Sequence, residues 1–288
     1  MNKKNKKTIG KVLFWILVIY LFFFLVFPFY WTINTSLKTE NQLLMTPATF
    51  VPVDNITDQV SISINNYKAV FLNNTFVNGL KNSLIVAGSV TILCLVIGSF
   101  AAFALGKLNF KGKTFSLYLI LSMTMFPQIS VLTGLYAVIN KLHISATPAM
   151  IFSYFLFTLP FTIWVMTSFF KGLPKSLMQA ANVDGATPLQ SFYLILLPLT
   201  VPALVTTGLL SFIAAWNEYL FALTFTSIES QARTVPVAMA LFTGSIAKQE
   251  PFGEIMAAAV VVTIPLLILV YVFQRRLIEG LTAGAVKG

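Results

Sequence analysis

The sequence has little charge. Of its 288 residues, 10 % are charged and 57 % are hydrophobic. A soluble globular domain carries about a quarter charged residues, because its surface faces water. The polar sequence in this chain is too short to cover a soluble domain of the same length. The composition therefore excludes an ordinary soluble fold and indicates an integral membrane protein.

The chain also lacks the residues from which most metal and nucleophilic sites are built. It has one histidine, His143, and one cysteine, Cys94. Without a cysteine pair or a histidine cluster, no zinc site can form at the usual spacing. No Gly-x-Ser-x-Gly motif occurs either. We therefore predict no catalytic residue and no metal site, and we interpret Cys94 as a small packing residue within an apolar run.

One segment, at 106–114, resembles a phosphate-binding loop but fails on spacing. Five residues separate Gly106 from Gly112, whereas the motif requires four, and no strand is predicted before it. We interpret the segment as a basic turn between two membrane spans. The chain is therefore not expected to hydrolyse ATP itself.

Long runs without charged residues dominate the rest of the chain. Crossing the hydrocarbon core of a bilayer takes about 20 apolar residues. In lipid the backbone must satisfy its own hydrogen bonds, so such runs are helical. Pro127, with Gln128 beside it, and Pro160 are expected to mark kinks. The sequence predicts an all-α protein with six transmembrane helices, at 12–33, 82–106, 114–140, 144–170, 191–217 and 255–274.

The basic residues set the orientation of these spans. Thirteen of the 19 lysines and arginines fall on one side of the membrane and six on the other. Positive residues concentrate on the cytoplasmic side, which places both termini in the cytoplasm. The same distribution, between hydrophobic runs, argues that the net charge of +10 does not reflect nucleic-acid binding. Segments 34–81 and 229–254 are then external, and segment 171–190 is internal.

The internal segment carries a full set of helix signals. Pro174 suits the first turn of a helix, and good helix formers follow it. Gly185 suits the left-handed position just after a helix end. Thr187 and Pro188 then suit an N-cap and the first residue of a new helix. We predict a short helix, a tight turn and a second helix that continues into the span at 191–217.

The spacing in this segment resembles a known motif. Gln179-Ala180-Ala181, three residues, Gly185, nine residues and then the sequence Ile-Leu-Leu-Pro at 195–198 are similar to the "EAA" loop of ABC importer permeases. That pattern is Glu-Ala-Ala-x3-Gly-x9-Ile-x-Leu-Pro, and Gln179 replaces its glutamate. The stretch 215–223 and the C-terminal segment 280–288 further resemble the carbohydrate-uptake branch, near the smaller permease subunit of maltose-type importers. The resemblance covers almost the whole chain, most strongly residues 79–288.

The resemblance implies a type I ABC importer transmembrane domain. Residues 1–78 would hold the cytoplasmic N-terminus, the first span and an external segment. Residues 79–276 would form the permease core with a cytoplasmic coupling loop at 171–198, and 277–288 a cytoplasmic tail that reaches the ATPases. The residues implied in ATPase coupling are Met178, Gln179, Ala180, Ala181, Asp184, Gly185 and Pro198.

The implied partners are a second homologous permease subunit, an ABC ATPase dimer and an extracytoplasmic solute-binding protein. ATP and Mg would be used by the ATPases, with no cofactor on this chain. The implied location is a bacterial or archaeal inner membrane. The implied function is import of a carbohydrate or sugar-derived solute, such as an oligosaccharide, a disaccharide or a glycoside-type compatible solute, by alternating access. The alternatives are an ATPase-independent secondary transporter or channel, and a membrane scaffold.

Two further candidate sites lie outside the coupling loop. Glu218 is an acid within apolar sequence, which is a functional candidate in a membrane protein. With Asn217 and Tyr219 it either lines the translocation pathway or anchors the helix end at the membrane interface. In related permeases an external loop reaches into the binding protein, and Gly244-Ser245 would suit its flexible tip.

Overall fold

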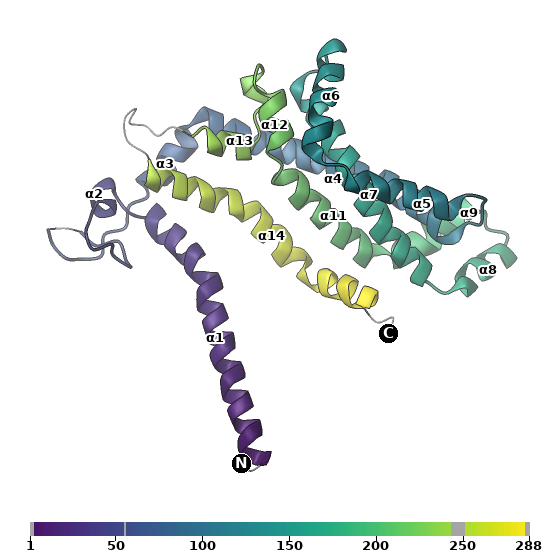
Figure 1. Ribbon diagram of the computed structural model, residues 1–288, viewed down its shortest axis with the longest axis horizontal. Coiled ribbons are helices and arrows are strands. Elements are labelled where there is room, and N and C mark those ends of the chain that lie inside the picture. Colours follow the sequence, from purple (N-terminus) through teal and green to yellow (C-terminus); the bar gives the residue numbers. More distant parts are fainter. Residues whose placement is uncertain (1–2, 55, 243–250, 286–288) are drawn as a thin grey trace. The chain divides into compact units, whose positions relative to one another are not determined.

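The computed structural model describes residues 3–54, 56–242 and 251–285, and they form two compact units. The first comprises Met1–Asn74 with Phe242–Thr263, and the second Thr75–Leu241 with Ile264–Gly288. Regular structure in the described ranges is helical, apart from an isolated β-bridge between Val53 and Val60 (Figure 1). The prediction of an all-α protein is confirmed.

The first unit contains the N-terminal helix and the external segment that follows it. Its helices are α1 (Lys3–Ser36), α2 (Glu40–Leu43), α3 (Asn65–Leu72) and the first part of α14 (Phe252–Ala285). The large apolar side chains of α1 between Val12 and Ile33 are mostly exposed, which suits a helix surrounded by lipid.

A buried lysine organises the start of the external segment. The Nζ atom of Lys38 donates a hydrogen bond to the backbone oxygen of Thr49 at 2.5 Å and lies 5.4 Å from the centre of the Trp31 ring. Burial lowers the pKa of Lys38. The amide of Asn66 on α3 donates to the backbone oxygens of Ser36 and Lys38. These contacts join both ends of the segment.

An exposed turn follows in the same segment. The backbone N–H groups of Ile56 and Thr57 donate to the carboxylate of Asp54 and lower the pKa of that group.

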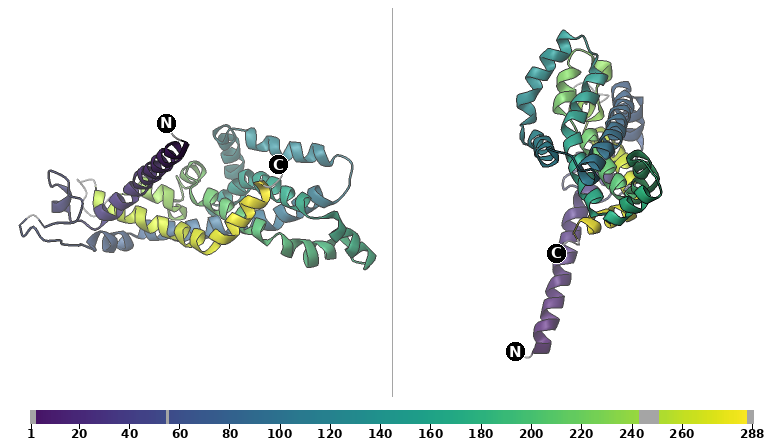
Figure 2. Two further views of the ribbon diagram at one scale, coloured as in Figure 1. Left: turned by 90° about the horizontal axis from the view of Figure 1, so that it is seen from below. Right: turned by 90° about the vertical axis from the view of Figure 1, so that its right-hand side faces the viewer.

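The second unit contains the remaining spans and the internal segment. α7 packs against α11, and α12 packs against α6 and α7. Figure 2 shows the same elements from two further sides. The elements are α4 (Asn74–Lys107), α5 (Lys113–Ser122), η1 (Met123–Met125), α6 (Gln128–Lys141), α7 (Ala146–Gly172), α8 (Lys175–Val183), α9 (Pro188–Ser191), η2 (Phe192–Leu196), α10 (Leu197–Leu199), α11 (Val201–Trp216), α12 (Leu220–Phe225), η3 (Ser230–Ala232), α13 (Val235–Ala240) and the rest of α14.

Small residues on α4 allow close packing against α7. A Cβ atom added to Gly106 would lie 2.6 Å from the Cβ atom of Phe170, and one added to Gly98 would lie 2.9 Å from the Cγ2 atom of Thr162. Such small residues let helix backbones approach in lipid. Next to this contact, Phe103 and Phe192 join Phe170 in a buried aromatic cluster.

The described residues contain four helices long and apolar enough to span a membrane, and two bent helix pairs. The six predicted spans are therefore recovered when each bent pair is counted as one span. The run 114–140 is not the single kinked helix we predicted, because α5 and α6 meet at 93°. Pro127 lacks an N–H group and disfavours helical backbone at Phe126, so the helix ends there.

The prediction of a continuous helix through 191–217 is also wrong. The segment bends by 77° where α10 ends and α11 begins, at Thr200. Prolines at 198 and 202 flank this residue, and each removes one backbone donor from the helix. Pro160, in contrast, lies inside α7 without ending it. α14 stays helical to Ala285, so the predicted C-terminal tail begins as a helix.

Candidate functional site

The internal helix α8 is anchored on one face and free on the other. Leu177 and Met178 pack against the buried cluster formed by α4, α7 and η2, and Ala181 is buried. Gln179 is exposed on the opposite face, and Val183 is 86 % exposed. A short helix of this kind has little stability of its own and depends on the packed face. The packed face therefore holds α8 in place, and the exposed face is available to a partner.

The turn after α8 is the one the sequence predicted. The N–H of Ala186 bonds to the oxygen of Ala181 at 2.9 Å, and the N–H of Gly185 bonds to that of Asn182 at 3.1 Å. Gly185 has a φ of 77°. This pair of bonds around a left-handed glycine is the Schellman motif, which ends a helix sharply. The chain direction after α8 is thus set by Gly185.

Thr187 starts the next helix as predicted, with a partner that sequence reasoning missed. The N–H of Gln190 donates to Thr187 Oγ1 at 3.3 Å, and the N–H of Thr187 donates to Gln190 Oε1 at 2.8 Å. Pro188 occupies the first turn. The Thr-x-x-Gln spacing is the sequence signature of such a capping box, so the role of Gln190 could have been predicted from the sequence.

The structure gathers six of the seven predicted coupling residues on α8 and its turn. Gln179, Ala180, Asp184 and Gly185 are exposed there, whereas Met178 and Ala181 face inward. Pro198 is exposed as well, but it lies in α10, beyond the π-helical η2. The exposed positions around Gln179 and Gly185 therefore form the available surface.

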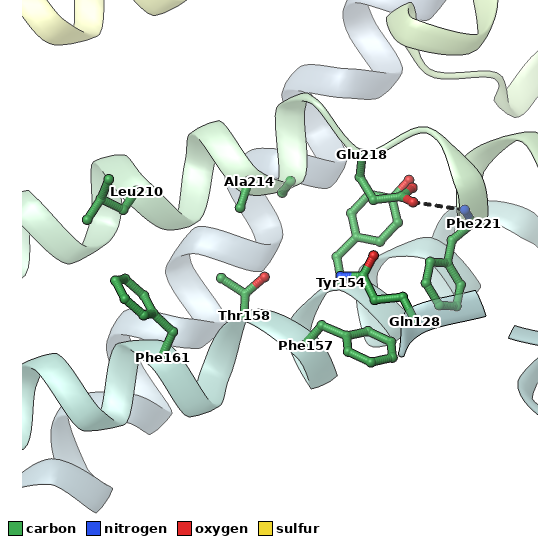
Figure 3. Close-up of a pocket in the computed structure, with 10 residues that line it drawn as sticks. Gln128, Tyr154, Phe157, Thr158, Phe161, Leu210, Ala214, Glu218 and Phe221 are labelled. Carbon is green, nitrogen blue, oxygen red and sulfur yellow. Dashed lines mark hydrogen bonds between the residues drawn. The ribbon is translucent and has the colours of Figure 1, made fainter. Parts of the chain in front are cut away.

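A cavity of about 310 Å³ lies between α6, α7, α11 and α12. Figure 3 shows Glu218, Tyr154 and Gln128 near one end, and Leu210 and Phe161 at the other. The residues lining it are Gln128, Tyr154, Phe157, Thr158, Phe161, Leu210, Ala214, Ala215, Glu218 and Phe221.

Glu218 has a structural role here that the sequence did not reveal. It links α11 to α12, and its carboxylate accepts the N–H groups of Phe221 at 2.9 Å and Ala222 at 3.1 Å. It therefore caps α12 while also lining the cavity (Figure 3). Asn217 instead donates to the backbone oxygen of Ile213, and neither Asn217 nor Tyr219 lines this cavity.

Gly244 and Ser245 lie outside the described residues. Within the described ranges, no group of three or more metal-ligating side chains is present. The turn at 106–114 follows the helix α4, and Gly112 precedes α5 with a φ of 86°.

These features define a multi-pass helical membrane protein with an anchored, amphipathic internal helix between its spans. Its membership of a family is shown by sequence. The chain belongs to the family of binding-protein-dependent transport system inner membrane components, whose sequence model matches residues 94–282. It is a permease subunit of the ABC importer class, as the resemblance of its internal loop predicted.

Individual relatives agree with this assignment. The chain is 41 % identical over 266 residues to the trehalose/maltose transport system permease protein MalG of Thermococcus litoralis, covering 91 % of this chain and 92 % of that protein. It is 42 % identical over 229 residues to the trehalose transport system permease protein SugB of Mycobacterium tuberculosis, covering 79 % and 83 %. Both matches extend over most of the chain, well beyond the internal loop.

The fold also matches a solved structure. A chain from the crystal structure of a bacterial ABC transporter involved in the import of the acidic polysaccharide alginate superposes with a TM-score of 0.76. The identity is 21 %, and the match covers 96 % of this chain and 98 % of the other. The type I importer fold is thereby supported across nearly the full length.

Proposed function

We propose that this subunit imports a carbohydrate by alternating access in an inner membrane. It would pair with a second homologous permease subunit above an ABC ATPase dimer, and an extracytoplasmic binding protein would deliver the solute. ATP and Mg would be used by the ATPases. Curated relatives more than 40 % identical are named for trehalose and maltose transport, which supports a saccharide.

The observation that supports the coupling role is that α8 has one packed face and one exposed face. Its inner face, with Leu177 and Met178, packs on the cluster that contains Phe170 of α7 and Phe192 of η2. A push on the outer face would therefore be transmitted to two membrane-spanning elements. An exposed Val183 next to polar Gln179 suits a partner groove that is apolar in part.

Motion can follow from this contact because the elements it reaches are interrupted. The bend at Thr200 divides the span that begins with η2, and the bend at Phe126 divides the span of α5 and α6. Bends of this kind are places where a few backbone angles absorb a rigid-body change. ATP-driven closure of the ATPases would then move the inner ends of the spans and alter access to the cavity.

A secondary transporter would work without such a partner. The family assignment favours the ABC mechanism, because that family serves binding-protein-dependent systems. The test is affinity purification of the tagged permease from mild detergent, followed by identification of the bound proteins and assay of saccharide uptake in proteoliposomes. We expect an ATPase to co-purify and uptake to require ATP. Uptake by the permease alone would contradict the proposal.

A further inference from the structure

The cavity beside Glu218 has the chemistry of a ligand site. Its volume of about 310 Å³ is at the lower end of small-molecule sites, which span about 300–1,000 Å³. Such sites combine apolar walls with a few fixed polar groups. Here the rings of Phe157 and Phe161 supply apolar surface, and Glu218, Tyr154 and Gln128 supply the polar groups.

Tyr154 and Glu218 form the polar end of the cavity. The side chain of Tyr154 is only 3 % exposed, and its buried hydroxyl group lies next to the carboxylate of Glu218, which is the acceptor within its reach. Leaving such a group unpaired costs about 1–3 kcal/mol, so buried hydroxyls are normally satisfied. Tyr154 and Glu218 both line the cavity and lie together at one end of it (Figure 3). Tyr154 therefore positions Glu218, and the partly exposed carboxylate is the group that a ligand can reach.

The carboxylate of Glu218 is also held in place by the backbone. Bonds from the N–H groups of Phe221 and Ala222 fix both of its oxygens. An acceptor position remains open beside these bonds and Tyr154, because an ionised carboxylate offers about four such positions. Glu218 can therefore accept a ligand hydroxyl group without changing its conformation, which favours binding by preorganisation.

The charge of the lining restricts the solute. No lysine, arginine or histidine lines the cavity, so a second negative charge would be repelled by Glu218. An acidic sugar is thereby disfavoured. A quaternary ammonium solute such as choline could contact the rings and the carboxylate, but its single hydroxyl group cannot pair with both Glu218 and Gln128.

We propose that this cavity is a subsite for one ring of a neutral sugar, contributed by this subunit to the translocation pathway. Glu218 and Gln128 hydrogen-bond its hydroxyl groups, Tyr154 positions the Glu218 carboxylate, and Phe157 and Phe161 contact its apolar face. The subsite rests on the proposed saccharide import, and it adds that the importer discriminates within the membrane against acidic sugars.

The test uses the assembled importer with a reporter cysteine in the cavity. Cys94 is buried and is first replaced by alanine, and Ala214→Cys is then introduced in the cavity wall. The rate of modification by a small thiol reagent is measured with trehalose, maltose, diacetylchitobiose, glucuronate or choline present. We expect at least one neutral saccharide to protect the thiol and glucuronate and choline to leave it reactive.

Matched variants separate binding from general effects of mutation. Tyr154→Phe and Glu218→Gln should raise the half-protecting saccharide concentration about threefold to tenfold, because the first frees the Glu218 carboxylate from its buried neighbour and the second removes its charge. Thr167→Val is the control, since Thr167 carries a buried hydroxyl on α7 that does not line the cavity. It should leave protection unchanged.

The outcomes distinguish the subsite from the proposed function. Saccharide uptake by the wild-type importer without protection of Ala214→Cys would overturn the subsite and leave the function intact. Protection by choline or glucuronate, or protection unaffected by Tyr154→Phe, would overturn it as well. If none of the three saccharides is imported, the proposed function fails and the subsite fails with it.

Discussion

The Nζ atom of Lys107 donates a hydrogen bond to the backbone oxygen of Leu173 at 2.6 Å. Lys107 is the last residue of α4, and Leu173 follows α7 at the start of the link to α8. Bonds from a charged donor are stronger than neutral ones. This bond forms although Lys175 and Lys113 are near enough to repel Lys107. The bond therefore links the inner end of α4 to the segment between α7 and α8.

Loss of this bond should weaken coupling more than assembly. Lys107→Met keeps the aliphatic stem and removes the charged donor, so the link between α4 and the segment before α8 loses about 1.5–3 kcal/mol. We expect solute-dependent ATPase stimulation in the assembled importer to fall several-fold. Lys111→Met, at an exposed site in the same turn, is the control and should behave like the wild type. Equal stimulation in both variants would show that the bond is irrelevant to coupling.

Gly185→Val tests the direction of the chain after α8. Nothing lies within 4 Å of an added Cβ atom there, so the effect comes from the φ of 77° alone. A branched residue in this conformation costs about 1–3 kcal/mol, enough to displace a short helix without unfolding the spans. We expect normal insertion and pairing with the second permease, weak retention of the ATPase and loss of uptake.

Gly112→Val is a closely matched control for that substitution. Gly112 has a φ of 86°, also with nothing within 4 Å, but it lies in the turn between α4 and α5. The same strain at that turn should leave ATPase pull-down near normal. Gln179→Glu should be tolerated, because it restores the residue usual in the motif. Full ATPase binding and transport in Gly185→Val would refute the coupling assignment.

Gly106→Ala tests the contact between α4 and α7. The added Cβ atom would lie 2.6 Å from Phe170 Cβ, so one helix must shift. Overpacking of this kind costs about 1–3 kcal/mol. Gly88→Ala lies on the same helix with nothing within 4 Å and should be neutral or stabilising. In detergent, Gly106→Ala should unfold at a lower temperature than the wild type. Unfolding at a higher temperature would exclude close packing at this position.

Lys38→Met tests the organisation of the external segment. It removes the donor to Thr49 and the cation near Trp31, so limited proteolysis within 38–64 should accelerate. Lys68→Met, at an exposed site on α3, should not change the cleavage rate. Because burial lowers the pKa of Lys38, the unfolded segment binds more protons than the folded one. The resistance of the wild-type segment to proteolysis should therefore increase as the pH rises toward the ordinary lysine pKa of 10.5.

Local sequence was sufficient for much of this protein. The apolar runs set where spans occur, because only helices satisfy their backbone in lipid. The helix–turn–helix at 174–188 was also predictable, since Pro174, Gly185, Thr187 and Pro188 act through the conformations of a few neighbouring residues.

Tertiary structure alone decided the features that join distant parts of the chain. Proline at 127 and 198 signals a possible interruption, but the angles of 93° and 77° depend on what each half packs against. Glu218 was visible as an acid in apolar sequence, yet its place beside Tyr154 depends on the packing of α12 against α7. The bond from Lys107 to Leu173 spans 66 residues of sequence. Such contacts form only when side chains from separate helices pack together, and no local pattern encodes them.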